Sequence, residues 1–322
     1  MPSDDDPRFF VRRADWQRDR AALRAVRIAV FVQEQSIPEA IEWDGLDAEA
    51  VHLIAESADG DAIGTARLLA SGQIGRMAVL EDWRERGVGT RLLIELLRIA
   101  AEDGYPAPFM NAQTTAGHFY RGLGFETVGE VFEEAGILHQ RMVIDELELP
   151  LIVDVQTRLL GQTADLLTID EPRVLRHAAA ALAKQARREL RVLTPDLEPV
   201  LYDHQPFLEQ VTRLALERRG RLPVRILLID EGPAVRRGHR LIELARKLSS
   251  SVEIRAVPAE LAEQADHYLL ADDAGYCLRR YAAPRSALVD FNDPRTVRRI
   301  QREFEQIWEQ GAAHPGLRRL HV

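Results

Sequence analysis

Two arginines and two glycines stand together where an apolar run gives way to a helical pattern. The stretch is Arg84-Glu-Arg86-Gly87-Val-Gly89. Unpaired N–H groups at the start of a helix attract anions, and glycine lets a phosphate approach the backbone. The guanidinium groups add positive charge at the same place. The stretch predicts a phosphate-binding loop; a basic turn before a surface helix is the alternative, because short glycine motifs are common.

The first half of the chain predicts the elements that must position this loop. A strand at 73–80 precedes it, and a helix from Gly87 to about Asp103 follows, with Leu92, Leu93, Leu96, Leu97 and Ala100 on one face. Asp15 is expected to cap a helix that runs to about Val30. Further strands are expected at 9–12, 51–56, 63–69, 108–113, 125–131 and 137–144, and a short helix at 115–123.

The second half alternates helical and strand patterns, which predicts a second α/β domain. Helices are expected at 172–190, 206–219, 238–249 and 293–309, and strands at 191–194, 224–230, 252–257, 268–271, 276–280 and 288–291. The intervening stretch has weak periodicity and contains Pro150 and Gly161. We therefore expect domains at 1–147 and 169–322, joined by a linker at 148–168.

Composition narrows the classes of function. The 322 residues are 46% hydrophobic and 29% charged, as in globular proteins, and the net charge of -9 argues against binding nucleic acid through bulk phosphate attraction. Cys277 is the one cysteine, so the sequence holds no disulfide pair and no thiolate zinc site, and no metal is expected. The first residues lack the apolar core of a signal peptide, and no apolar run reaches membrane-spanning length. We expect a cytoplasmic protein with no membrane partner.

Several motifs of the first half resemble the GNAT superfamily of N-acetyltransferases. Arg84-x-x-Gly87-x-Gly89 resembles its Gln/Arg-x-x-Gly-x-Gly/Ala signature, and 74–79 and 119–125 resemble its preceding strand and its later aromatic–tyrosine motif. The resemblance covers about residues 9 to 144. Finer features resemble the ElaA-like branch: Phe31–Gln35, Trp43–Asp47, His52, Ala112-Gln113 and Gly136–His139.

The resemblance implies a GNAT fold, with a mixed, mostly antiparallel sheet and flanking helices. It implies acetyl-CoA as co-substrate and direct attack by an amine, of a small molecule or peptide, in a ternary complex. The strand end would hold the pantetheine arm, with the Val79 N–H on the thioester carbonyl, and the loop would hold the pyrophosphate. The implied cofactor residues are Met77, Ala78, Val79, Arg84, Arg86, Gly87, Val88, Gly89, Thr90 and Phe119.

Acetyl transfer also needs an acid for the departing thiolate and a way to neutralise the amine. The resemblance implies Tyr120 as the acid, although an aromatic residue on an amphipathic helix also fills core space. His139 is a candidate base because imidazoles exchange protons near neutral pH; a structural strand histidine or a water chain is the alternative. Glu34, His52 and Gln113 are candidates for the acceptor side, and each fits a structural role equally well.

Residues from about 190 to 310 resemble half of a phospholipase D-like domain. Active members need His-x-Lys-x-x-x-x-Asp; here His267 is present, but Leu269 and Ala274 stand at the lysine and aspartate positions. An apolar side chain cannot bind a phosphate, so phosphodiesterase activity is not expected. Such halves pack in pairs, which predicts a homodimer through this domain. The alternative overall function is an acetyl-CoA sensor without turnover.

Overall fold

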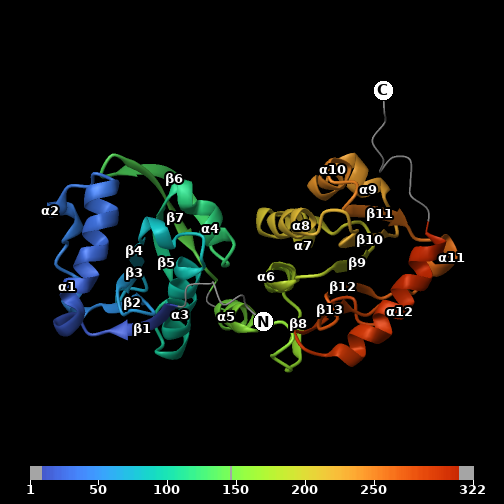
Figure 1. The fold of residues 1–322 in the computed structure, drawn as a ribbon, viewed down its shortest axis with the longest axis horizontal. Helices are drawn as coiled ribbons and strands as arrows, with labels where there is room; N and C mark the ends of the chain where they lie inside the picture. Colours follow the sequence, from blue (N-terminus) through green and yellow to red (C-terminus); the bar gives the residue numbers. More distant parts are fainter. Residues whose placement is uncertain (1–8, 146, 312–322) are drawn as a thin grey trace. The chain divides into compact units, whose positions relative to one another are not determined.

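The computed structural model describes residues 9–145 and 147–311 and has an α/β fold (Figure 1). The chain divides into two compact units, Met1–Val153 and Asp154–Val322. The stretch expected as a linker contains helix α5 (Leu149–Thr157), whose Leu149, Ile152 and Val155 are buried. The sequence did not predict this helix, because its periodicity is weak and Pro150 was interpreted as a break. Pro150 stands in the first turn of the helix, where proline is tolerated.

Unit 1 contains two antiparallel sheets. Strands β1 (Phe9–Ala14), β2 (Val51–Ser57), β3 (Ala62–Leu68) and β4 (Ile74–Val79) form the first in that order. Strands β5 (Phe109–Gln113), β7 (Ile137–Val143) and β6 (Glu126–Glu134) form the second. A single parallel bridge between Gln73 and Phe109 joins the sheets within the described residues. Strands β4 and β5 therefore start side by side, and beyond that point they do not pair with each other.

Helix α3 (Val88–Glu102) begins directly after the predicted phosphate loop and buries Leu92, Leu93, Leu96 and Leu97, as the periodicity predicts. Helix α1 (Trp16–Arg27) is capped by Asp15, as expected, whose side chain accepts from Gln17 N–H and Arg18 N–H. Beyond Arg27 the chain continues as a wider π-helical segment, Ile28–Glu34, rather than ending near Val30. Short helices α2 (Glu39–Glu42) and α4 (Gly117–Arg121) complete the unit.

Unit 2 contains one seven-stranded sheet in the order β11-β10-β9-β12-β13-β14-β8. Strands β9 (Leu190–Thr194), β10 (Val224–Leu228) and β11 (Val252–Ala256) are parallel. Strands β12 (His267–Ala271), β13 (Gly275–Arg279), β14 (Ala287–Asp290) and β8 (Leu167–Ile169) are antiparallel to their neighbours. The expected second α/β domain is confirmed. Strand β8 was not expected, because its three residues are too few to give a sequence pattern.

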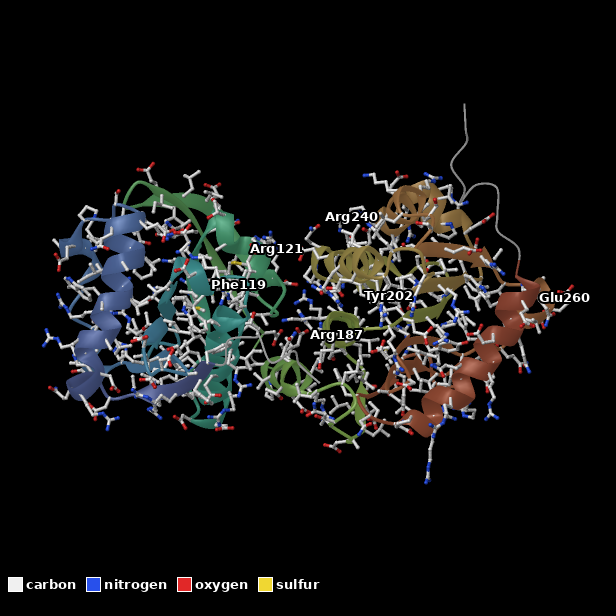
Figure 2. All side chains as sticks on the ribbon, viewed as in Figure 1. Phe119, Arg121, Arg187, Tyr202, Arg240 and Glu260 are labelled. Carbon is white, nitrogen blue, oxygen red and sulfur yellow. The ribbon has the colours of Figure 1, made fainter. Side chains whose placement is uncertain are left out.

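Helices α6 (Pro172–Gln185), α8 (Gln205–Glu217), α10 (Arg240–Lys247) and α12 (Pro294–Gln310) accompany this sheet. Helix α12 is capped by Asp293 and packs through Val297, Ile300, Phe304 and Trp308, which are buried. The helix expected at 238–249 starts later, because left-handed Gly238 ends α9 (Gly232–Arg237). Tyr202 lies in the interior of unit 2, whereas Glu260 on α11 (Ala259–Ala262) is exposed (Figure 2).

Candidate functional site

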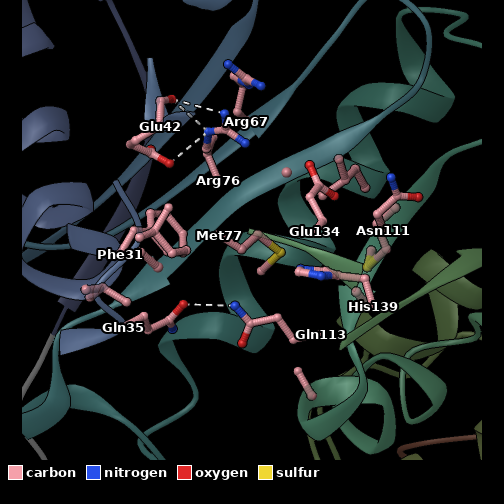
Figure 3. Close-up of a pocket in the computed structure, with 18 of the residues that line it drawn as sticks. Phe31, Gln35, Glu42, Arg67, Arg76, Met77, Asn111, Gln113, Glu134 and His139 are labelled. Atoms are coloured by element: carbon pink, nitrogen blue, oxygen red, sulfur yellow. Dashed lines mark hydrogen bonds and ion pairs between the residues drawn. The ribbon is translucent and has the colours of Figure 1, made fainter. Parts of the chain in front are cut away.

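A cavity of about 580 Å³ lies in unit 1 where β4 and β5 diverge. Residues of the π-helical segment, β4, β5, α4 and the β6–β7 hairpin line it (Figure 3). Ten of the fifteen candidate cofactor, catalytic and acceptor residues line it: Glu34, Met77, Ala78, Val79, Arg84, Gly89, Gln113, Phe119, Tyr120 and His139. The two sheets thus bring together residues that lie more than a hundred positions apart in the sequence.

The loop before α3 has the geometry of an anion site. Gly87 adopts a left-handed φ of 84° at the N-cap, and no side chain caps the helix within the described part of the chain. The first helical bond runs from Arg91 N–H to the Gly87 carbonyl at 2.9 Å, so the amides of Val88, Gly89 and Thr90 precede it. Amides at this position attract anions. A Cβ on Gly89 would contact Phe119 at 3.6 Å, which places this glycine against the cavity wall.

The two arginines of the loop differ in their surroundings. Arg84 donates through both terminal nitrogens to Glu34, at 2.9 and 2.5 Å, and through Nε to the Val79 carbonyl at 3.0 Å. Hydrogen bonding by Arg84 lowers the pKa of the Glu34 carboxyl. Arg86 lies 5.5 Å from the centre of the Trp83 ring. Arg86, Gly87, Val88 and Thr90 lie in the loop and first turn but are not among the residues that line the cavity.

Tyr120 lies on α4 with its hydroxyl 3.9 Å from the Met77 sulfur of β4. Its ring meets Phe119 edge-on at 5.0 Å. Burial raises the pKa of the phenol to about 12. The side chain is therefore neutral at physiological pH and can donate its proton or a hydrogen bond into the cavity.

His139 lies on β7 directly opposite Gln113 of β5. Its Nδ1 is 2.9 Å from the Ile137 carbonyl oxygen, and its ring stacks on Phe132 at 6.0 Å. A bond to a carbonyl requires the proton on Nδ1, so the neutral ring carries its lone pair on Nε2. The geometry gives a fixed ring with an accepting nitrogen at the cavity.

Polar groups gather at the end of the cavity formed by the π-helical segment and the β6–β7 hairpin. Gln113 donates to the Gln35 side chain at 2.8 Å. Glu134 extends from the hairpin beside Asn111 and His139 (Figure 3). Asn111 and Glu134 were not predicted from the sequence, and Gln35 was noted only within the ElaA-like stretch Phe31–Gln35. Nothing in a strand or loop pattern shows which polar residues face a cavity.

His52 is not brought to this cavity. The side chain is 1% exposed, stacks on Trp16 at 4.7 Å, and bonds the Asp47 carbonyl through Nε2 at 2.8 Å. Burial lowers the pKa of this imidazole. Its position on β2 faces inward, so His52 packs in the core and does not contact the acceptor side.

A buried ion network, which sequence analysis did not identify, lies under the loop around Asp44. Arg27 bonds Glu42 at 2.5 Å and Asp47 at 2.9 Å, and Arg67 bonds Asp47 at 2.8 Å and Asp44 at 2.6 Å. Hydrogen bonding by Arg67 lowers the pKa of Asp44, whereas burial raises that of Glu42. Arg76, with a left-handed φ of 50°, adds ion pairs to Glu42 and Asp44 at 3.1 Å (Figure 3). These contacts fix the loop to β3 and β4 beside the cavity.

Two negative findings bear on the chemistry. Residues 9–145 and 147–311 contain no group of three or more His, Cys, Asp or Glu side chains that could hold a metal. Over the same residues, no helix is both long and apolar enough to span a bilayer.

Two family models match the chain. "Acetyltransferase (GNAT) domain" matches residues 19–146, and "Domain of unknown function (DUF7931)" matches residues 171–320. The N-acetyltransferase YjcF of Bacillus subtilis is 36% identical over 125 residues, which are 37% of this chain and 88% of YjcF. Protein ElaA of Escherichia coli is 33% identical over 135 residues, 39% of this chain and 88% of ElaA. The crystal structure of Escherichia coli ElaA is similar with a TM-score of 0.39 and 28% identity, covering 43% of this chain and 100% of ElaA.

Proposed function

The chain belongs, through its N-terminal unit, to the GNAT acetyltransferase family, and we propose that this unit transfers the acetyl group of acetyl-CoA to an amine. One observation carries the proposal. The β4–β5 opening, Gly89 at the uncapped start of α3 and the Tyr120 side chain all line one cavity. This is the arrangement needed to bind a diphosphate at one end and a thioester at the other.

The co-substrate fits the residues present. The amides of Val88, Gly89 and Thr90 would hold the pyrophosphate, and the absence of a Cβ at Gly89 leaves room beside Phe119. Met77, Ala78 and Val79 on the unpaired side of β4 would bind the pantetheine arm. The Val79 N–H would then stabilise the oxyanion that forms on the thioester carbonyl.

Transfer proceeds by direct attack in a ternary complex. The amine nitrogen forms a bond to the acetyl carbon, and the carbon–sulfur bond breaks as the tetrahedral intermediate collapses. The Tyr120 hydroxyl gives its proton to the departing sulfur, and the resulting phenolate is reprotonated from solvent. His139 Nε2, directly or through water, accepts the proton that the nitrogen of the acceptor must lose for transfer to occur. The accepting tautomer at His139 supports this assignment.

Charge in the cavity points to a cationic acceptor. The carboxylates of Glu34, Glu42 and Asp44 each pair with an arginine. Glu134, the remaining carboxylate of the lining, has no hydrogen bond or ion pair among the described residues. We assign Glu134 to a positive group of the acceptor, so that a diamine is favoured over a monoamine.

The test is acetyl transfer by the purified chain. Acetyl-CoA is incubated with a panel of mono- and diamines, free thiol release is followed, and co-substrate binding is measured separately by calorimetry. Thiol release that requires an amine supports transfer. Binding without release under every amine supports the second candidate, an acetyl-CoA sensor, and no binding heat at all contradicts both.

The role of unit 2 is a separate proposal. Its phospholipase D-like resemblance stays a prediction, and Leu269, which is fully buried in β12, leaves no cation at the lysine position. We propose that this unit has no phosphodiesterase activity and pairs with its copy in a homodimer. Light scattering at micromolar concentration tests the pairing, and a monomer contradicts it.

A further inference from the structure

A second hollow, of about 680 Å³, runs along helix α12 of unit 2. Arg191 of β9 forms one side, and the other residues belong to α12: Arg295, Arg298, Gln301, Arg302, Glu305 and Gln306. The apolar face of α12 packs on the sheet, so these polar residues lie on its flank. Four arginines thus share one hollow in a chain whose net charge is -9.

The arginines at the base of the hollow are already neutralised. Arg191 lies 2.6 Å from Glu189 and 3.1 Å from Glu305, and Arg225 of β10 bonds both oxygens of Glu305 at 2.7 Å. The Glu305 carboxylate is therefore engaged by two guanidinium groups that the sheet holds in place. It cannot also neutralise the arginines on the exposed part of α12.

Arg298 and Arg302 have no such partner. Neither side chain makes a hydrogen bond or an ion pair among residues 9–145 and 147–311, and both are exposed. Arg299, between them in sequence, faces another direction and pairs with Glu303 at 3.2 Å. The two unpaired arginines are four positions apart, so they stand side by side on one helix face.

Their position is unfavourable for the helix itself. Like charges four residues apart on a helix repel each other. Residues whose local effect destabilises an element occur at functional sites. A bound anion would remove this repulsion, because it would neutralise the pair.

We propose that this hollow binds a small anion with two adjacent phosphate groups, of the inorganic or organic diphosphate class. Arg298 and Arg302 are about 6 Å apart along the helix axis, which suits adjacent phosphates, and each guanidinium can bind oxygens in a bidentate manner. The volume lies within the range of small-molecule sites, roughly 300–1,000 Å³. The lining holds no aromatic or aliphatic residue to stack on bases or enter a bilayer, which favours a small ligand over a nucleic-acid strand or a membrane.

Calorimetric titration of the full chain with pyrophosphate and with ADP tests the site. Arg298→Gln and Arg302→Gln are each expected to weaken pyrophosphate binding by about tenfold or more. Arg299→Gln is the matched control, with the same charge change on the same helix, and is expected to stay within about twofold. Far-UV circular dichroism verifies that the helix content of all three is unchanged. The proposal is overturned if the wild-type chain fails to bind pyrophosphate or if all three variants weaken binding equally. It is also overturned if Arg298→Gln and Arg302→Gln leave binding unchanged, because pyrophosphate would then be bound elsewhere, as at the loop before α3.

Further titrations distinguish the source of the phosphate. Orthophosphate should bind more weakly than pyrophosphate, because a single phosphate group can contact only one of the two arginines at a time. A short single-stranded oligonucleotide or vesicles of anionic lipid that bind more than about tenfold tighter than ADP, at 0.15 M salt and in a manner lost with Arg298→Gln, would overturn the small-ligand assignment. None of these readouts depends on acetyl transfer, and the Arg298 and Arg302 variants distinguish this hollow from the loop before α3, so this proposal and the proposed function fail independently.

Discussion

Arg84 bonds the Glu34 carboxylate through both terminal nitrogens while its Nε donates to the carbonyl oxygen of Val79. One guanidinium thus connects the phosphate loop, the end of β4 and the π-helical segment. The pairing also means that the positive charge of Arg84 is partly neutralised before any co-substrate binds. Glu34, a candidate for the acceptor side, is therefore bound directly to the predicted phosphate loop.

Opposite effects are expected from the two members of this pair. Glu34→Gln removes a negative charge near the diphosphate and should lower the Kd for coenzyme A about two- to fivefold, because an exposed ion pair contributes only about 0.2–1 kcal/mol. Arg84→Gln should raise that Kd about tenfold, because it removes a charge-assisted contact. Isothermal titration measures both. A Glu34→Gln variant with an unchanged Kd for coenzyme A but a raised KM for the amine would assign Glu34 to the acceptor alone.

Backbone strain at the loop gives a second prediction. Gly87 has a φ of 84°, and no atom lies within 4 Å of the position that a Cβ would take, so Gly87→Ala is unfavourable only through its conformation. The left-handed backbone costs an alanine about 1–2 kcal/mol. Gly104, at the other end of α3, has a φ of 72° and equally open surroundings. Both alanine variants should unfold at lower denaturant concentration by a similar amount. Only Gly87→Ala should also weaken coenzyme A binding, and equal binding by the two variants would mean that the loop does not hold the diphosphate.

The strand and the helix that flank the predicted phosphate loop could be predicted from the sequence because their signal is local. The glycine–arginine spacing, the strand before it and the amphipathic helix after it all lie within 31 residues, 73–103, and the structure places them as expected. The acceptor side could not be predicted in this way. Whether Glu134 or His52 faces a cavity depends on the pairing of β7 with β5 and on the packing of α1 against the sheet, which a strand pattern does not encode.

The buried network shows the same limit. Arg67 and Arg76 are ordinary charged residues in strand patterns, and Asp44 and Asp47 resemble solvated loop acids. Only the fold brings them within 2.6–3.1 Å of one another. In unit 2, the adjacent Arg298 and Arg299 are typical of a solvated helix face in the sequence. The structure pairs Arg299 with Glu303 and leaves Arg298 without a partner among the described residues.

Tyr120→Phe removes the proposed acid and leaves the ring in place. We expect kcat to fall by about 10²–10⁴-fold with the Kd for coenzyme A unchanged, because positioned acid catalysis contributes about that much. Since the pKa of Tyr120 is about 12, the wild-type rate should show no decline attributable to this acid below about pH 10. Tyr105→Phe is the control, as it makes the same chemical change outside the cavity lining. Unchanged turnover in Tyr120→Phe would leave the residue with a packing role only.

Stability at low pH depends on Asp19. Hydrogen bonding by Arg12 lowers the pKa of this carboxyl to about 2, from an ordinary value near 3.8. Because the folded-state pKa is the lower one, the contribution to stability is complete above about pH 4 and is lost as the pH falls through about 2. Asp19→Asn should therefore lower the Tm at pH 7 by about 2–4 °C, as expected for about 1 kcal/mol, and the difference from wild type should close near pH 2. Calorimetric scans at both pH values measure this, and a difference that persists at pH 2 would exclude the ion pair as its cause.

Glu134→Gln tests the class of acceptor. The variant keeps the shape of the side chain and removes its charge, so the KM for a diamine should rise about tenfold while the KM for a monoamine changes by less than about twofold. Glu133→Gln is the matched control, because successive strand residues point to opposite faces and Glu133 is not among the residues that line the cavity. Steady-state kinetics with both amines separate the possibilities. Equal shifts in the two variants would indicate a general effect of negative charge on the hairpin, and a fall in kcat with an unchanged KM would make Glu134, rather than His139, the group that accepts the proton.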